Sequence, residues 1–132
     1  MPAQGNSGFD LLESILFEMN GIGKFPKSVL TDKEGLPIAA AASDGSNADK
    51  QSAVVAFIQK AAIQASKQLE FAELDEISFS YKDGQQLVIL PFNVKDKVLI
   101  LTTIVTDRNQ PYRKITSNAI SEIIKVWDYY WK

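Results

Sequence analysis

Residues 29–39 read VLTDKEGLPIA and predict a β-hairpin, with an apolar arm on each side of a short polar loop. Asp32 and Gly35 belong to the loop, and glycine can adopt the left-handed conformation that closes a hairpin with a bulge. Pro37 has no N–H to donate to a neighbouring strand, so the second arm is expected at the edge of a sheet. The segment therefore predicts two antiparallel strands, of which the second, at residues 36–40, has an open side.

Amphipathic helices are predicted near both ends of the chain. Apolar side chains within residues 9–19 recur at helical spacing, with Ser7 as the N-cap and Asn20-Gly21 as the stop. After Pro111, a final helix carries apolar side chains on one side and polar side chains on the other. Each of these helices has one apolar face, so both are expected to pack on a sheet.

A longer helix is predicted over residues 48–69, with Ser46 or Asn47 as its N-cap. Its apolar side chains cover an arc of about 200° on the helical wheel, which is wider than the stripe needed to pack on one sheet. A second surface is therefore expected to cover part of this helix. The apolar arc consists of Ala53, Val54, Val55, Phe57, Ile58, Ala61, Ala62, Ala65 and Leu69.

A strand with one solvent-facing side is predicted at residues 77–81, where apolar side chains alternate with serines. Asp83-Gly84 then predicts a hairpin turn into a strand at residues 86–92. The serine-lined strand is expected at an edge of the sheet, where it can recruit another edge strand.

Two strands are expected to be covered on both faces, because residues 87–90 and 98–101 are apolar at every position. The turn between them is placed at residues 93–97. The predicted fold class is α+β with the order α-ββ-α-βββ-α: a five-stranded, mainly antiparallel sheet, with the long helix on one face and the two terminal helices on the other. Residues 9–132 are expected to form a single domain after a flexible N-terminus at residues 1–8.

The composition argues against catalysis, metal binding and nucleic-acid binding. The chain has no His and no Cys, so it lacks the commonest general base, the commonest metal ligand and any disulfide or thiolate chemistry. Its net charge of −2 disfavours binding to a phosphate backbone. The sequence has no signal-peptide layout and no apolar run of membrane-spanning length. We therefore expect a cytoplasmic protein without membrane insertion, cofactor, metal site or catalytic residue.

Charged and aromatic clusters outside these elements are interpreted mainly as surface. The acidic run at residues 70–76 is assigned to a solvated linker. Arg108 and Arg113 could contact a partner, but a local ion pair with Asp107 is the favoured interpretation. The aromatic residues at 127–131 suit a core and an interface equally well. Trp127, Tyr130 and Trp131 project onto the core-facing side of the helix, and Tyr129 is expected to be the most exposed. The candidate partner surface consists of Asp44, Arg108, Arg113 and Tyr129.

The order of all these elements resembles the roadblock/LC7 domain family, from Phe9 to Trp127. The hairpin at residues 29–39, with its aspartate and a glycine three residues later, is the most telling segment. The resemblance implies a dimer, with itself or with a related roadblock subunit, in which the long helices pack together and the third strands pair across a two-fold axis. The implied dimer interface consists of Val54, Phe57, Ile58, Ala61, Ala65, Ile77, Ser78, Phe79 and Ser80.

Members of this family serve as regulators or scaffolds for small Ras-like GTPases, including bacterial polarity modules, or as dynein light chains. Activators among them contribute no dedicated catalytic residue. The resemblance therefore implies a non-catalytic dimeric regulator or scaffold that binds a small Ras-like GTPase. The alternatives are a profilin-like or PAS-like small-molecule sensor, a light-chain adaptor of a motor complex and, in third place, an enzyme.

Overall fold

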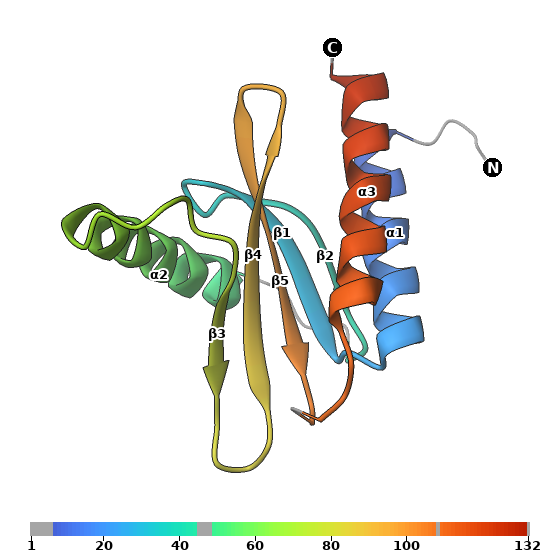
Figure 1. Cartoon of the computed structure of the whole chain (residues 1–132). Coiled ribbons are helices and arrows are strands. Elements are labelled where there is room, and N and C mark those ends of the chain that lie inside the picture. The colour runs from blue at the N-terminus through green and yellow to red at the C-terminus, as the bar shows by residue number, and fades with distance from the viewer. Residues whose placement is uncertain (1–6, 45–48, 108, 132) are drawn as a thin grey trace.

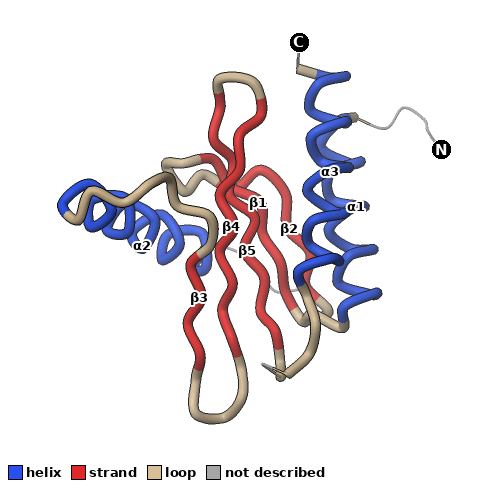
Figure 2. The backbone as a smooth tube through the Cα atoms, in the orientation of Figure 1, coloured by secondary structure: helices blue, strands red, loops and turns tan. Residues whose placement is uncertain are grey.

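A computed structural model describes residues 7–44, 49–107 and 109–131 of the chain (Figure 1). The predicted fold class is confirmed, because one five-stranded antiparallel sheet has the strand order β2-β1-β5-β4-β3. Helices α1 and α3 lie side by side on one face of this sheet, and α2 lies on the other (Figures 1 and 2). The elements are α1 (Gly8–Gly23), β1 (Lys27–Asp32), β2 (Pro37–Ala42), α2 (Asp49–Gln68), β3 (Ile77–Ser80), β4 (Gln86–Val94), β5 (Lys97–Val105) and α3 (Arg113–Tyr130).

Local sequence signals placed the start of α1 and the first hairpin correctly. Ser7 caps α1 in a capping box with Asp10. Gly35 has a φ of 89°, and Asp32 Oδ1 accepts hydrogen bonds from the backbone N–H groups of Glu34 and Leu36. The register of the hairpin shifts between Leu30 and Thr31, where Ile38 of β2 is the extra residue, and β2 is an edge strand. The proposed caps of α2, Ser46 and Asn47, lie outside the described residues.

The predicted end of α1 at Asn20-Gly21 was wrong, because the helix continues to Gly23. Lys24 ends it in the left-handed conformation with a φ of 57°. The next residue, Phe25, is buried, and its N–H donates to Asn20 O at 3.0 Å. Gly21 therefore permits the helix to end but does not require it to end there. The helix ends just before Phe25 enters the core.

The predicted turn at residues 93–97 was also too long. Strand β4 continues to Val94 and β5 begins at Lys97, so only Lys95 and Asp96 form the turn. Val94 is buried, which holds the end of β4 in the sheet, and Lys95 adopts the positive φ of 58° that a tight turn can require.

Strand β5 is buried on both faces, as its sequence predicts. Leu99 and Leu101 pack toward α1 and α3, whereas Ile100 packs toward α2. The two layers differ in size. In the described residues, the buried apolar cluster on the α2 side contains only Val55, Ile89 and Ile100, whereas the cluster under α1 and α3 takes in residues from both helices and four strands.

The aromatic C-terminus connects the end of α3 to the start of α1. Trp127 is buried and stacks on Trp131 with ring centroids 4.4 Å apart, and Phe9 meets Trp131 edge-on at 5.0 Å. Tyr129 is 71% exposed, as expected, but Tyr130 is also exposed although its helical position had suggested the core. The two tryptophans therefore belong to the fold and not to a free surface.

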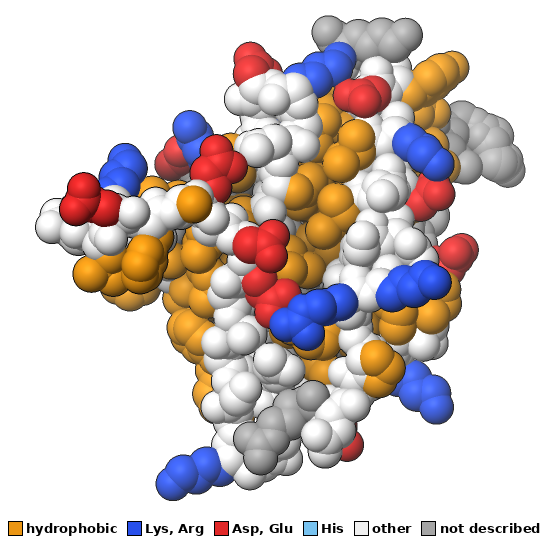
Figure 3. Space-filling view, viewed as in Figure 1, with side chains coloured by type: hydrophobic (Ala, Val, Ile, Leu, Met, Phe, Trp, Pro, Cys, Tyr) orange, Lys and Arg blue, Asp and Glu red, His pale blue; other side chains and the backbone are white. Residues whose placement is uncertain are grey.

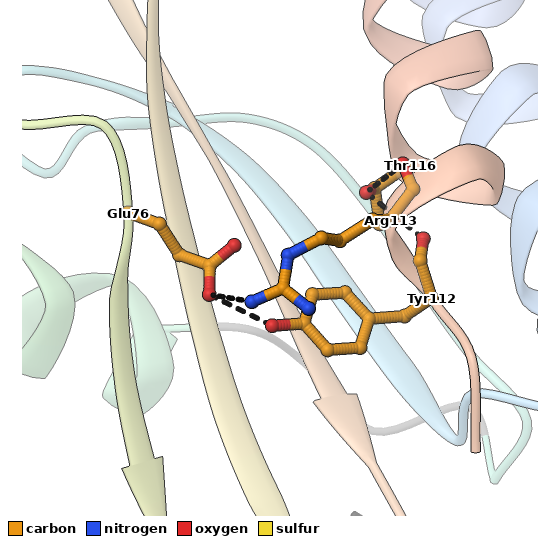
Figure 4. Close-up of polar contacts among 4 residues, drawn as sticks. All are labelled: Glu76, Tyr112, Arg113 and Thr116. Carbon is orange, nitrogen blue, oxygen red and sulfur yellow. Dashed lines mark hydrogen bonds and ion pairs between the residues drawn. The ribbon is translucent and has the colours of Figure 1, made fainter. Parts of the chain in front are cut away.

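A polar cluster links the start of β3 to the start of α3 across the sheet (Figure 4). The Tyr112 hydroxyl donates to Glu76 Oε2 at 2.7 Å, and the Arg113 guanidinium forms an ion pair with the same oxygen at 3.2 Å. Thr116 donates to Tyr112 O at 3.0 Å. The acidic run is thus not wholly solvated, since the Glu76 side chain is only 17% exposed, and Arg113 pairs with Glu76 instead of Asp107. We call Glu76, Tyr112 and Arg113 the Glu76 cluster.

The Glu76 cluster predicts a loss of stability at alkaline pH. Burial of the phenol, followed by its hydrogen bond to Glu76, raises the pKa of Tyr112 from 10.0 to about 12. The unfolded chain therefore loses this proton first, and the free energy of unfolding falls as the pH rises from about 10 to about 12. We expect Tyr112→Phe to lower the free energy of unfolding at neutral pH by about 1 to 3 kcal/mol, because a hydrogen bond to a charged group is lost.

Urea unfolding of both proteins at neutral pH and between about pH 10 and 12 checks this expectation. The gap in stability between wild type and Tyr112→Phe should narrow as the pH rises. Tyr129→Phe, which alters an exposed tyrosine, is the matched control and should leave stability unchanged. A gap that stays constant over this pH range contradicts the role assigned to the Tyr112 hydroxyl.

Candidate functional site

The outward side of α2 is apolar. Phe57 is 75% exposed, and Val54 is exposed beside it. Ala61 and Ala65 follow Phe57 at the spacing of one helical turn and are exposed as well. Single exposed apolar side chains are ordinary on a soluble protein, but a contiguous row of them marks an interaction surface. These four residues of the predicted interface therefore share one exposed helix face.

The inward side of α2 is partly polar, which is the reverse of an ordinary surface helix. Ser52 and Gln59 are buried between α2 and the rest of the chain, next to the buried Val55. Ile58, which was also assigned to the interface, is half-buried against the sheet. Burying polar side chains stabilises a layer less than burying apolar ones. Helix α2 therefore obtains limited hydrophobic stabilisation from its own sheet.

Strand β3 supplies the second part of the candidate interface. It pairs only with β4 in the described sheet, so its outer side is open. Ile77 is half-buried against the α2 layer, and Phe79, two residues on, faces the same side of the sheet and is 38% exposed. Ser78 and Ser80 are exposed on the opposite side. The strand thus offers both unpaired backbone groups and an exposed aromatic ring.

These two parts adjoin one another in space. Helix α2 extends beyond β3 in the view of Figure 1, and in Figure 3 apolar side chains gather along α2 and the neighbouring β3 edge. None of the nine predicted interface residues carries a charge. The ion pair between Lys60 of α2 and Glu34 at 3.7 Å joins two well-exposed side chains and contributes little to stability.

Sequence reasoning missed part of this surface. Phe71 is exposed where the chain leaves α2, and Ile63 on α2 is partly exposed. Leu69, which was assigned to the apolar arc but not to the interface, is exposed as well. Phe71 is an apolar residue within the acidic run at residues 70–76, and this unusual position was the signal that could have identified it. Glu76 was missed as well, because its partner Tyr112 is distant in sequence. The Glu76 cluster holds the chain immediately before β3 and so fixes the start of the open edge.

Two of the residues predicted to contact another partner, Arg113 and Tyr129, are far apart. Arg113 and Tyr129 lie at opposite ends of α3, about 24 Å apart along the helix axis. Asp44 follows β2, and Arg108 lies outside the described residues. Arg113 and Tyr129 therefore do not belong to one local surface.

The described part of the chain contains no candidate metal site and no candidate membrane-spanning helix. Among those residues, no group of three or more acidic side chains could hold a metal ion. None of their helices has the length and apolarity needed to cross a membrane.

The fold is shared with several solved structures. Myxococcus xanthus MglB has a TM-score of 0.80 at 16% identity, covering 99% of this chain and 98% of that one. The gliding protein MglB from Thermus thermophilus has a TM-score of 0.76 at 14% identity, covering 96% of both chains. A structure described as MglB with tetrameric arrangement has a TM-score of 0.75 at 14% identity, covering 96% of this chain and 95% of that one. At these identities the likeness establishes the fold alone.

Sequence comparison identifies the family. Among curated proteins, no relative matches this sequence. The family model of the Roadblock/LC7 domain, however, matches residues 13–104, which include strands β1 to β4, α2 and nearly all of β5. This match covers well over half of the chain, and it agrees with the resemblance seen in the hairpin and the element order. The chain therefore belongs to the Roadblock/LC7 domain family.

Proposed function

We propose that this protein is a non-catalytic regulator or scaffold that dimerises through α2 and β3 and binds a small Ras-like GTPase. The observation that carries the dimer is the outward apolar face of α2 beside an unpaired edge strand. Family membership supports the GTPase as partner, since members of the family regulate or tether such GTPases. The role is one of binding, and the exposed residues of α2 in the proposed dimer contact are apolar.

A two-fold dimer satisfies both parts of this surface at once. Antiparallel pairing of β3 with its copy would extend the sheet, and the rows containing Phe57 would meet across the axis. An apolar, uncharged face is complementary to itself, which a two-fold interface requires. A protein of similar fold, MglB, has been described in a tetrameric arrangement, so self-association is compatible with this architecture.

A small-molecule sensor is less well supported by the packing. An enclosed apolar ligand site would be expected between a helix layer and the sheet. In the described residues, Val55, Ile89 and Ile100 are fully buried on the α2 side, and a larger set of side chains is buried under α1 and α3. A hollow of about 500 Å³ beside α2 is lined by apolar residues, Ile63 and Phe71 among them, and by about as many polar or charged residues. Its mixed lining adjoins the proposed interface, which favours a macromolecular partner.

The dimer proposal predicts that Phe57→Asp converts the protein into a monomer. A buried aspartate would face its own copy across the two-fold axis, where desolvation and like charge both oppose association. Phe17→Asp is the matched control, because Phe17 on α1 is 74% exposed and Phe57 is 75% exposed. Light scattering coupled to size exclusion should find a dimer for wild type and Phe17→Asp, and a monomer for Phe57→Asp. A wild-type monomer at micromolar concentrations would defeat the proposal.

The partner proposal predicts nucleotide-dependent binding to a GTPase. Each small Ras-like GTPase of the source organism would be loaded with GDP or with a non-hydrolysable GTP analogue and titrated with the dimer in a calorimeter. We expect at least one GTPase to bind, with affinities that differ between the two nucleotide states because regulators respond to the switch conformation. Absence of binding for all of them, in both states, contradicts this part of the proposal and leaves the dimer untouched.

The non-catalytic character predicts a small effect of Arg113→Ala on any stimulated GTP hydrolysis. An arginine finger accelerates hydrolysis by about 10³ to 10⁵. The Arg113 guanidinium instead forms an ion pair with Glu76, so its loss should change the stimulated rate by less than about tenfold. Single-turnover hydrolysis measures this directly. A loss of about a thousandfold or more would identify Arg113 as a catalytic residue and refute the non-catalytic role.

A further inference from the structure

The sheet has a second edge at β2, and a groove runs between this strand and α1. The two elements pack side by side, and β2 lies at the opposite end of the sheet from β3 (Figure 2). The groove has a volume of about 890 Å³. Helix α1 contributes Phe17 and Ile22, which are 74% and 64% exposed, and β2 contributes the alanines at residues 40–42. Glu13 and Glu18 also line it.

Gly21 lines the same groove, and nothing within the described chain requires a glycine there. A Cβ atom built at Gly21 meets no heavy atom within 4 Å, and the residue does not have a positive φ. The other two glycines of α1 differ, because a Cβ at Gly8 would clash with Trp131 and one at Gly23 with Phe25. Glycine destabilises a helix relative to alanine. Its presence at position 21 therefore keeps the groove open to an incoming group.

The two sides of the groove are fixed to each other. Asn20 Nδ2 donates to Ala41 O at 3.1 Å, and the buried Ser28 donates from its hydroxyl to Asn20 Oδ1 at 2.6 Å. These bonds join α1 to both strands of the first hairpin. Because the groove is already ordered, binding would cost little additional conformational entropy, which favours its use as a recognition site.

The charges of the groove decide what kind of occupant it suits. The two charged residues that line it, Glu13 and Glu18, are both acidic. A second copy bound through the same groove would bring like charges together, and an anionic lipid surface would be repelled. We propose that the groove between α1 and β2 binds a segment of a different protein, one that carries a large apolar side chain flanked by lysine or arginine. Because the groove lies at the far edge from β3, the proposed dimer leaves it open.

A fluorescein-labelled peptide of sequence KKLFKKLLKK is a suitable probe, and fluorescence anisotropy measures its binding to the full chain. Wild type should bind it saturably. Gly21→Gln, which fills the open space, and Phe17→Asp should each weaken binding by about tenfold or more, as expected for central contacts. Gly21→Ala adds only a methyl group in open space and is the control for folding. Phe57→Asp alters the outward side of α2, on the other face of the sheet from α1, and should leave the affinity unchanged.

The role of charge is tested separately. The counterpart peptide EELFEELLEE should not bind wild type, and the double variant Glu13→Lys, Glu18→Lys should prefer it over the lysine peptide. Equal affinity of wild type for both peptides, or unchanged binding by Gly21→Gln, overturns the proposal. A change of oligomeric mass in Gly21→Gln would assign the groove to a second copy, and binding of phosphatidylglycerol vesicles without peptide binding would assign it to a membrane; either result refutes the proposal. None of these readouts depends on the dimer or on a GTPase.

Discussion

Burial of β5 on both faces is the constraint on which the remaining elements depend. Leu99 and Leu101 require a layer on one side, and Ile100 requires one on the other, because each fully buried apolar side chain contributes about 1.5 to 3 kcal/mol. Strand β5 also pairs with β1 and with β4, so it joins the first hairpin to the second half of the sheet. The order α-ββ-α-βββ-α meets this need by placing α2 between the two halves of the sequence and the terminal helices together on the opposite face.

The two layers bury different amounts of apolar surface, and this difference explains why the outward side of α2 is apolar. The layer under α1 and α3 is a large apolar core, whereas the α2 layer is thin and includes the polar Ser52 and Gln59. The apolar side chains of α2 that the sheet does not cover, Val54 and Phe57 among them, remain outside. Covering them with another subunit would add hydrophobic burial where the isolated chain has little of it. The same apolar contact would then stabilise the α2 layer and hold the two subunits together.

The fold was predictable because its signals are local: the two-residue alternation of strands, the apolar faces of the helices and the turn residues Asp32, Gly35 and Gly84. The predictions were wrong where tertiary packing, and not the local sequence, determines the structure. The end of α1 depends on burial of Phe25, and the exposure of Tyr130 on how the two tryptophans pack with α1. For the site, helical spacing indicated the exposed row on α2. It could not indicate that Ile58 turns inward or that Glu76 reaches Tyr112, since neither contact has a sequence pattern.

The two edges of the sheet differ in chemistry, and this difference separates self-association from recognition of other molecules. A two-fold interface must be complementary to itself, and the uncharged face of α2 with Phe79 of β3 fulfils that condition. The groove at β2 does not, because its charges have one sign and a copy of itself would repel it. Occupants of the two edges therefore need not compete, because β1, β5 and β4 lie between β2 and β3. The two proposals together assign self-association to β3 and α2, and recognition of a partner of opposite charge to the groove at β2.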